Sequence, residues 1–314
     1  MSPLRLVFMG TPDLARTVLA ALADEPRYQV LAVVAQPDKP TGRGLQLTPP
    51  PVKVEALARS LPVHQPLKAR DPAFLGQLRA LAPDIIAVAA YGQILPQALL
   101  DIPRHGCLNV HTSLLPRWRG AAPIQWAIAE GDEETGVTIM RMEAGLDTGP
   151  MISEVRTRIS PADTGQTLHD RLAGLGGRLL GETLPLYVAG ELPDRPQPAE
   201  GVTYARKITK EDGRLDWNLP AAVLDRRLRA FTPWPGGFAF LPAESKPKLL
   251  KIHRAEPLAR PAPSTPGAVL SADRNGMVVA CGEGALRLLE LQPEGSRRMT
   301  AEQFLSGHRL DRLA

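Results

Sequence analysis

The sequence predicts an α/β protein: a Rossmann-like domain with a mostly parallel sheet, followed by a small C-terminal β-barrel of the OB-like (oligonucleotide-binding) type. Two observations predict this fold class. Short, continuously apolar segments alternate with helix-like segments through residues 1–189, as buried parallel strands alternate with helices. Short strand-like segments separated by Gly and Asn turns then fill residues 208–314, a pattern typical of a small barrel.

The elements of the first domain follow from hydrophobic periodicity. Four apolar runs, one short strand and two antiparallel edge strands are predicted at residues 4–9, 28–35, 62–64, 84–90, 106–111, 136–142 and 151–159. Helices are predicted at residues 14–23, 52–60, 71–81 (capped by Asp71), 122–130 and 164–188. The turn after the first strand lacks the G-x-G-x-x-G fingerprint, which disfavours a dinucleotide site.

A proline-rich polar stretch, ELPDRPQPAE at residues 191–200, predicts a linker, which we place at residues 190–207. Beyond it, a helix is expected at residues 219–231 and a closing helix at 301–306. Five short strands are predicted in between, at residues 237–241, 249–255, 267–271, 277–281 and 285–291.

The formal net charge of +4 is unevenly distributed. Residues 1–203 hold 19 Lys and Arg against 21 Asp and Glu, whereas residues 204–314 hold 18 against 12. A basic surplus in the last third is typical of a module that binds a polyanion, although solvated surface charge gives the same count. The two cysteines form no C-x-x-C pair, and no apolar run reaches membrane length, so we expect a cytoplasmic protein without a membrane anchor.

The segment at residues 36–51, QPDKPTGRGLQLTPPP, is predicted to be a long loop without regular structure. It carries Lys39 and Arg43 among prolines and glycines. Such loops in compact domains are usually functional or disordered, and a solvated connector is the alternative. Farther along, Ile94 and Leu95 follow the C-terminal end of a predicted strand, where ligands bind in open α/β sheets. They are therefore candidate walls of an apolar pocket, with a role in the core as the alternative.

The stretch that can carry chemistry begins with Asn109 and His111, two apart on a predicted strand, so that both side chains share one face. An amide and an imidazole side by side suit a carbonyl oxygen that becomes negative during attack. Asp147, in a glycine-flanked segment, has room to approach the imidazole and move protons. No serine or cysteine sits in a nucleophile elbow, so direct transfer to an amine is the simpler chemistry.

These features also have structural interpretations. An Asn-x-His pair is more often a structural hydrogen-bonding pair, and Gly-Leu-Asp-Thr-Gly is more often a turn. A metal site could use His111 and Asp147, but asparagine is a poor transition-metal ligand, which disfavours that interpretation.

Several segments together resemble the methionyl-tRNA formyltransferases, one family among the folate-dependent formyltransferases. They are NVHTSLLPRWRGAAPIQWAI, GVTIMRMEAGLDTGPMI, QPDKPTGRG, KITKEDGRLDWN and FTPWPGGF. The similarity extends over nearly the whole chain. The Asn-x-His and Leu-Asp-Thr-Gly elements alone indicate only the wider group, whereas RWRGAAPI and the C-terminal half are more specific.

The resemblance implies formyl transfer from 10-formyltetrahydrofolate, as co-substrate, to the α-amino group of methionine on initiator tRNA, with no metal. It implies that Asn109 and His111 polarise the formyl oxygen and that Asp147 orients His111 and manages protons. It also implies a folate-binding turn made of Ser113, Leu114, Leu115 and Pro116.

The same resemblance implies that the loop with Arg43 reads the weakly paired end of the tRNA acceptor stem. A basic, aromatic segment beside it suits a frayed single strand, through phosphate contact and stacking. The expected tRNA contacts are Lys39, Arg43, Arg117, Trp118, Arg119 and Lys207. Many relatives carry lysine after the Gly-Arg-Gly of this loop, whereas Leu45-Gln46-Leu47 follow here, so Arg43 is expected to make the specific contact.

Two alternatives stay open from the sequence. One is a formyltransferase that acts on a small amine, such as an amino-sugar nucleotide or glycinamide ribonucleotide. The other is a non-catalytic RNA-binding protein with a vestigial α/β domain. The expected partners are initiator methionyl-tRNA and the folate donor, and the chain is expected to be a monomer.

Overall fold

The computed structural model describes residues 2–41, 44–242, 247–259, 264–308 and 310–314. The chain falls into two compact units. The N-terminal unit comprises Met1–Pro123, Glu134–Arg158 and His169–Ala205, and the C-terminal unit comprises Ile124–Glu133, Ile159–Leu168 and Arg206–Ala314. No helix in the described part of the chain is long and apolar enough to cross a membrane.

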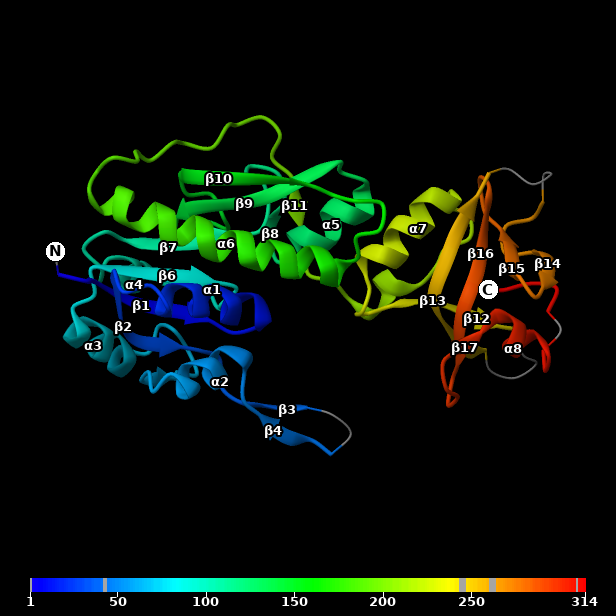
Figure 1. Ribbon diagram of the computed structural model, residues 1–314, viewed down its shortest axis with the longest axis horizontal. Helices are drawn as coiled ribbons and strands as arrows, with labels where there is room; N and C mark the ends of the chain where they lie inside the picture. Colours follow the sequence, from blue (N-terminus) through cyan, green and yellow to red (C-terminus); the bar gives the residue numbers. More distant parts are fainter. Residues whose placement is uncertain (1, 42–43, 243–246, 260–263, 309) are drawn as a thin grey trace. The chain divides into compact units, whose positions relative to one another are not determined.

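A seven-stranded sheet organises the described residues of the N-terminal unit, in the order β10-β9-β7-β6-β1-β2-β5 (Figure 1). The strands from β5 to β7 are parallel, and β9 and β10 add an antiparallel edge, which confirms the mostly parallel sheet that the sequence predicts. The bounds are β1 (Leu4–Gly10), β2 (Tyr28–Val34), β5 (Val63–His64), β6 (Ile85–Ala89), β7 (Cys107–His111), β9 (Glu134–Arg141) and β10 (Met151–Arg158).

Helices cover both faces of this sheet, because its central strands are apolar on both sides. On one face α6 packs so closely that a Cβ added to Gly176 would lie 2.7 Å from Val110 Cγ1. On the other face α3 and α4 bury Phe74, Leu78 and Leu99 against the sheet. The helices up to this point are α1 (Asp13–Ala23), α2 (Pro51–Ala58), α3 (Pro72–Leu81), α4 (Gln97–Leu100), α5 (Pro123–Glu130) and α6 (Gly165–Val188).

The predicted cap of α3 is present: the Asp71 carboxylate accepts a hydrogen bond from the backbone N–H of Ala73 at 2.8 Å. The predicted structureless loop at residues 36–51 is wrong in part. It contains a small antiparallel hairpin, β3 (Lys39–Thr41) paired with β4 (Gln46–Thr48). Its strands are short and exposed, and one contains a proline, so no apolar alternation marks them in the sequence.

The stretch at residues 191–205 packs on the N-terminal unit. Within it, β11 (Tyr204–Ala205) pairs in parallel with β8 (Arg119–Gly120), and Arg195 forms an antiparallel bridge with Met151. This stretch therefore contributes backbone pairing and side chains next to the ends of β7 and β10.

An antiparallel sheet forms the C-terminal unit, in the order β12-β13-β16-β15-β14 with β17 beside β16 (Figure 1). The chain end joins its two edges, because Ala314 pairs with Phe240 of β12 while Leu313 donates to Gly267 just before β14. The bounds are η1 (Lys210–Gly213), α7 (Ala221–Ala230), β12 (Gly237–Leu241), β13 (Lys248–Leu258), β14 (Val269–Asp273), β15 (Gly276–Ala280), β16 (Ala285–Pro293), β17 (Met299–Thr300) and α8 (Ala301–Leu305).

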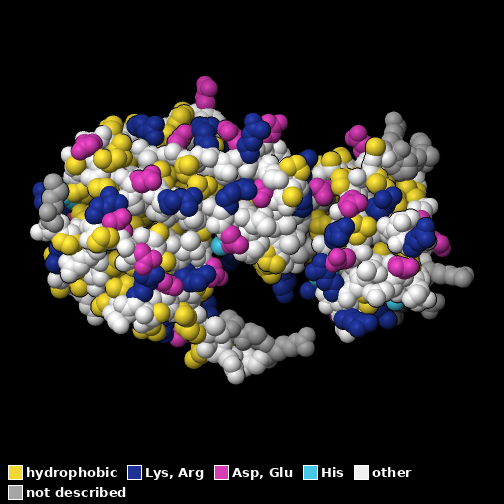
Figure 2. Space-filling model, viewed as in Figure 1, with side chains coloured by type: hydrophobic (Ala, Val, Ile, Leu, Met, Phe, Trp, Pro, Cys, Tyr) yellow, Lys and Arg dark blue, Asp and Glu magenta, His cyan; other side chains and the backbone are white. Residues whose placement is uncertain are grey.

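The predicted C-terminal β domain is thus confirmed, as an antiparallel sheet, and the sequence missed β17 and the pairing role of the chain end. Figure 2 shows Lys and Arg side chains interspersed with Asp and Glu on the visible face of this unit.

Candidate active site

A cavity of about 480 Å³ lies in the N-terminal unit at the carboxyl ends of β6 and β7. This is the edge at which open α/β sheets bind ligands, because loops diverge there from adjacent parallel strands. Its lining residues come from both strand ends, from the segments at residues 120–123 and 142–147, and from α1. They are Leu14, Val88, Ala90, Tyr91, Gly92, Gln93, Ile94, Asn109, Val110, His111, Thr112, Gly120, Ala121, Pro123, Met142, Leu146 and Asp147.

The three predicted catalytic residues meet in this cavity. Asn109 and His111 occupy alternate positions of β7, so their side chains share one face. The β9 ladder pairs with both residues, and the β6 ladder also pairs with Asn109. Both side chains are nearly buried, at 9% and 5% exposure. Asp147 reaches the cavity from the loop between β9 and β10, with φ of 51°, a conformation in which non-glycine residues are uncommon.

The two ring nitrogens of His111 have different surroundings. Nε2 lies 2.9 Å from the backbone oxygen of Trp118. A carbonyl oxygen only accepts, so Nε2 carries a proton and donates it. Nδ1 lies 3.8 Å from Asp147 Oδ2, beyond hydrogen-bond distance but within the range of a charge interaction. Nδ1 is therefore the nitrogen that can exchange a proton near the carboxylate.

Backbone and side-chain donors hold the Asp147 loop in place. Asp147 Oδ2 accepts a hydrogen bond from Gly120 N at 2.8 Å. The side-chain amide of Gln197 donates to the backbone oxygens of Asp147 and Gly149, each at 2.8 Å. Its Oε1 accepts from Arg119 Nε at 3.0 Å and Nη2 at 2.7 Å. Gln197 thus connects Arg119 to the loop that carries the carboxylate.

Sequence reasoning missed Gln197, because it lies in the proline-rich stretch predicted as a linker. The contacts join residues about 50 positions apart, and no local pattern marks them. The sequence also missed Tyr91 and Leu146 as cavity residues. The hydroxyl of Tyr91 is buried and has no hydrogen-bond partner among the described residues, and burial raises its pKa to about 12.

The predicted folate-binding residues separate into three groups. Ile94 is 87% exposed and lines the cavity, whereas Leu95 is buried in the core under α3 and α4. The turn at residues 113–116 is outside the lining: its backbone meets Thr138 of β9, which donates to Ser113 O and accepts from Leu115 N. The structure therefore brings one of the six predicted residues to the cavity.

The predicted tRNA residues are spread along the chain. Lys39 is exposed on the β3–β4 hairpin, and Arg43 lies outside the described residues. The guanidinium of Arg117 lies 4.4 Å from the Trp118 ring centroid. Trp118 itself is nearly buried with φ of 63°, and its backbone N–H donates to Thr203 Oγ1. Lys207, in the C-terminal unit, is exposed.

The arrangement provides an amide donor, an imidazole and a carboxylate around one partly apolar cavity. No serine or cysteine occurs among the described residues that line it. Within the described part of the chain, no three His, Cys, Asp or Glu gather as a metal-binding group would. Such a set of groups suits acyl transfer in which donor and acceptor react directly, with protein groups stabilising the developing oxyanion.

Comparison with known proteins identifies relatives over the whole chain. Residues 4–184 match the family model described as formyl transferase, and residues 207–309 match formyl transferase, C-terminal domain. The methionyl-tRNA formyltransferase of Myxococcus xanthus (strain DK1622) is 56% identical over 99% of this chain and 97% of its own length. That of Xanthomonas campestris pv. campestris (strain 8004) is 53% identical over 98% of each chain.

Solved structures share the fold at low identity. The sugar 3N-formyl transferase WlaRD, crystallised with dTDP and 5-N-formyl-THF, superposes with a TM-score of 0.64 at 15% identity, over 95% of this chain and 100% of its own. HypX from Aquifex aeolicus in complex with tetrahydrofolic acid gives 0.65 at 16% identity, and this chain spans about half of it (100% and 51%).

Proposed function

The chain belongs to the methionyl-tRNA formyltransferase family, and we propose that it transfers the formyl group of 10-formyltetrahydrofolate to the α-amino group of methionine on initiator tRNA. The observation that carries this proposal is the convergence of Asn109, His111 and Asp147 on one cavity at the ends of β6 and β7. The product is formylmethionyl-tRNA, the form in which the initiator amine is blocked for translation initiation.

Asn109 and His111 stabilise the oxygen of the formyl group. When the amine nitrogen attacks the formyl carbon, a C–N bond forms and the carbonyl oxygen becomes negative. The Asn109 amide offers it an N–H from β7. Since His111 Nε2 already donates to Trp118 O, the second donor is Nδ1–H of the protonated ring.

Asp147 and His111 manage the protons. The attacking α-amino group has a reference pKa of about 7.7–8.0, so a neutral fraction exists near neutral pH without a strong base. When the bond from the formyl carbon to the donor nitrogen breaks, that nitrogen needs a proton, and the attacking amine has one to lose. The Asp147 carboxylate is placed to accept the proton that the amine loses. His111 Nδ1, 3.8 Å from Asp147 Oδ2, is placed to give its proton to the departing donor nitrogen, and the proton on Asp147 then restores His111.

The folate donor is proposed to bind along the apolar side of the cavity. Ile94 and Leu146 are large apolar side chains that remain exposed at its wall, at 87% and 61%. An exposed apolar pair beside a reaction site suits the planar ring system of a pterin. The turn at Ser113–Pro116 remains a sequence-based prediction for the rest of the donor.

Initiator tRNA is proposed to contact both units. The exposed strand β3 carries Lys39, and Arg43, outside the described residues, follows it in the sequence. Residues 204–314 carry the basic surplus of the chain. We therefore assign catalysis to residues 1–189 and tRNA binding to residues 208–314, with the hairpin contributing to acceptor-stem recognition. Arg117 remains a candidate phosphate contact, whereas Arg119 is engaged with Gln197.

An acceptor comparison tests the proposal. The protein is incubated with labelled 10-formyltetrahydrofolate and, separately, with initiator methionyl-tRNA, elongator methionyl-tRNA or an amino-sugar nucleotide. We expect formyl transfer to the initiator, with much less to the other two. Transfer only to the sugar nucleotide would assign the cavity to a small amine, and tRNA binding without any transfer would exclude an enzyme.

A further inference from the structure

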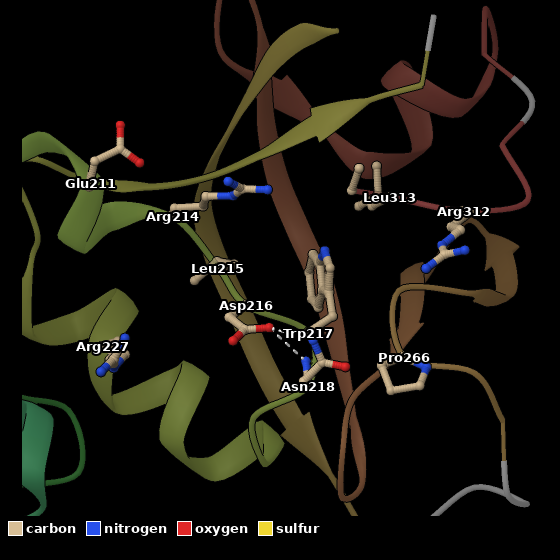
Figure 3. A pocket seen from close by; sticks show the side chains of 11 residues that line it. Glu211, Arg214, Leu215, Asp216, Trp217, Asn218, Arg227, Pro266, Arg312 and Leu313 are labelled. Carbon is tan, nitrogen blue, oxygen red and sulfur yellow. Dashed lines mark hydrogen bonds between the residues drawn. The ribbon is translucent and has the colours of Figure 1, made fainter.

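A second hollow, of about 550 Å³, lies wholly within the C-terminal unit (Figure 3). Its walls are the segment from η1 to α7, the chain end at residues 312–314, Pro266, and Arg227 of α7. Cavities of this size hold small molecules, and a single inorganic anion would fill only a part of it. No residue of the formyl-transfer cavity belongs to it.

Trp217 presents an unsatisfied donor to this hollow. The side chain is 5% exposed and belongs to the core of the unit, yet its Nε1–H has no acceptor among the described residues. In Figure 3 the nitrogen edge of the indole faces the space between Arg214 and Leu313. A buried N–H without an acceptor is costly, so an acceptor supplied by a ligand would be favourable there.

Guanidinium groups line the same hollow. In Figure 3 Arg214 and Arg312 extend toward the space from opposite sides, and Arg227 adds a third guanidinium to the lining. The Arg214 guanidinium lies 5.5 Å from the ring centroid of Phe240, which holds it in place. Among the described residues, Arg227 and Arg312 have no side-chain hydrogen bond or ion pair. These charges are therefore available to an anion.

Two carboxylates also line the hollow, those of Asp216 and Glu211. Asp216 Oδ1 accepts hydrogen bonds from the backbone N–H of Asn218 at 3.1 Å and from the Asn218 side-chain amide at 2.8 Å. The second carboxylate oxygen of Asp216 can therefore accept from a ligand. Glu211 lies on the same lining. A ligand that fits has an anionic acceptor group for the guanidinium groups and donor groups, such as hydroxyls or an amine, for the carboxylates.

We propose that this hollow is a binding site for one nucleoside phosphate. Its phosphate lies between Arg214 and Arg312 and accepts the Trp217 N–H, and its sugar or base donors face Asp216 and Glu211. The nucleotide is either free in solution or one unit of a single-stranded RNA. The site is a second one, separate from the formyl-transfer cavity, and it stands even if the acceptor of the formyl group is a different amine.

Calorimetric titration of the full chain with AMP tests the proposal, with adenosine and inorganic phosphate as reference probes. We expect one saturable AMP site and at least about tenfold weaker binding of either reference probe, since each lacks one half of the recognised groups. Arg312→Ala is expected to weaken AMP binding about tenfold, because a charged hydrogen bond to phosphate is lost. Arg274→Ala, an exposed arginine of the same unit outside the hollow, is expected to leave the affinity unchanged.

Trp217→Phe separates a ligand contact from a core role, because it removes the N–H and keeps a ring. We expect a several-fold loss of AMP affinity with an unchanged circular dichroism spectrum. Should this variant unfold, Arg312→Ala still decides the question, since Arg312 is exposed. A short RNA such as a tetranucleotide that binds more tightly than AMP would identify an RNA strand as the source, and equal or weaker binding would identify a free nucleotide.

Three results would overturn the proposal: no saturable AMP binding, phosphate binding as tight as AMP binding, or an Arg312→Ala affinity equal to that of the parent. The formyl-transfer rate tests the proposed function separately from the nucleotide site. A protein that binds AMP but formylates no tRNA would contradict the proposed function and leave the nucleotide site standing.

Discussion

In the N-terminal cavity, protein groups hold the side chains of His111 and Asp147, whereas in the C-terminal hollow Trp217 and Arg312 have no side-chain partner among the described residues. His111 Nε2 and Asp147 Oδ2 both bond to backbone atoms, and Gln197 fixes the loop behind Asp147. In contrast, the Trp217 N–H and the Arg312 guanidinium have no hydrogen-bond partner among the described residues. Groups that act on a transition state need fixed positions before the reaction. Groups that bind a ligand need hydrogen-bond donors or charges that no protein group already uses.

The largest expected effect comes from removing the carboxylate charge of Asp147 in the N-terminal cavity. Asp147→Asn keeps the size of the side chain and its acceptor for Gly120 N–H, but the amide cannot take a proton. We expect kcat for formyl transfer to fall by about 10²- to 10⁴-fold, with little change in Tm. Steady-state kinetics and thermal melts measure both, with Asp101→Asn, an exposed aspartate away from the cavity, as the control. A rate near that of the parent would remove Asp147 from the mechanism.

The second prediction concerns the support behind the carboxylate. Gln197→Ala removes the donors to Asp147 O and Gly149 O and frees Arg119. A displaced Asp147 is expected to lower kcat by about 10- to 100-fold while KM for tRNA stays close to the parent value. Gln97→Ala, an exposed glutamine on α4, is the control.

Gln197→Glu sharpens this test. The carboxylate still accepts from Arg119 but cannot donate to the two loop carbonyls, so its kcat is expected to resemble that of Gln197→Ala. A glutamate variant with full activity would mean that the link to Arg119 alone positions the loop.

The third prediction concerns substrate selection by the hairpin. Arg43→Leu removes the cation that the sequence predicts to contact the acceptor stem. We expect kcat/KM for initiator tRNA to fall about tenfold, with an unchanged Kd for the folate donor. Arg104→Leu, an exposed arginine of the same unit, serves as the control. An equal loss of tRNA and folate affinity would give the hairpin a structural role instead.

The smallest expected effect is on stability in the C-terminal unit. Hydrogen bonds from the Arg206 guanidinium, and then from Thr209, lower the pKa of the Asp212 carboxyl from 3.8 to about 2, although burial opposes them. Because the folded pKa is the lower one, ionised Asp212 stabilises the fold above pH about 4, and this stabilisation is lost as the pH falls through about 2.

Asp212→Asn is therefore expected to lower Tm by about 2–4 °C at pH 7, and the difference from the parent should disappear near pH 2. Thermal melts across this range measure it, with the exposed Asp311→Asn as the control. A difference that persists at pH 2 would show that the effect does not depend on the charge.

Much of the fold was predictable because it depends on local patterns. The buried strand Ile85–Ala89 is a continuous apolar run, and Asp71-Pro72 marks the start of α3. Elements that are exposed, or that form only by pairing with a distant strand, were not predictable in this way. The β3–β4 hairpin has Leu45 and Leu47 facing solvent, so it lacks the burial that creates a pattern.

The candidate site was predictable to the same degree. Asn109 and His111 share a face because a strand alternates, and the strand end places them at a ligand edge. Ile94 is exposed and its neighbour Leu95 is buried, and two aliphatic side chains of equal size give no sign in the sequence of which one faces the cavity. Gln197 acts through a fold-back of the chain onto the Asp147 loop, and only the three-dimensional structure shows that contact.

The central claim is that Asn109, His111 and Asp147 of the N-terminal cavity perform the transfer itself. The most direct test is the single-turnover rate of formyl transfer to initiator methionyl-tRNA by Asn109→Ala, with enzyme and donor in excess. Since one oxyanion donor is lost, we expect the rate to fall by about 10²- to 10³-fold, while the Kd of the donor stays within about threefold of the parent value. An unchanged rate, or a loss confined to donor affinity, would contradict the account.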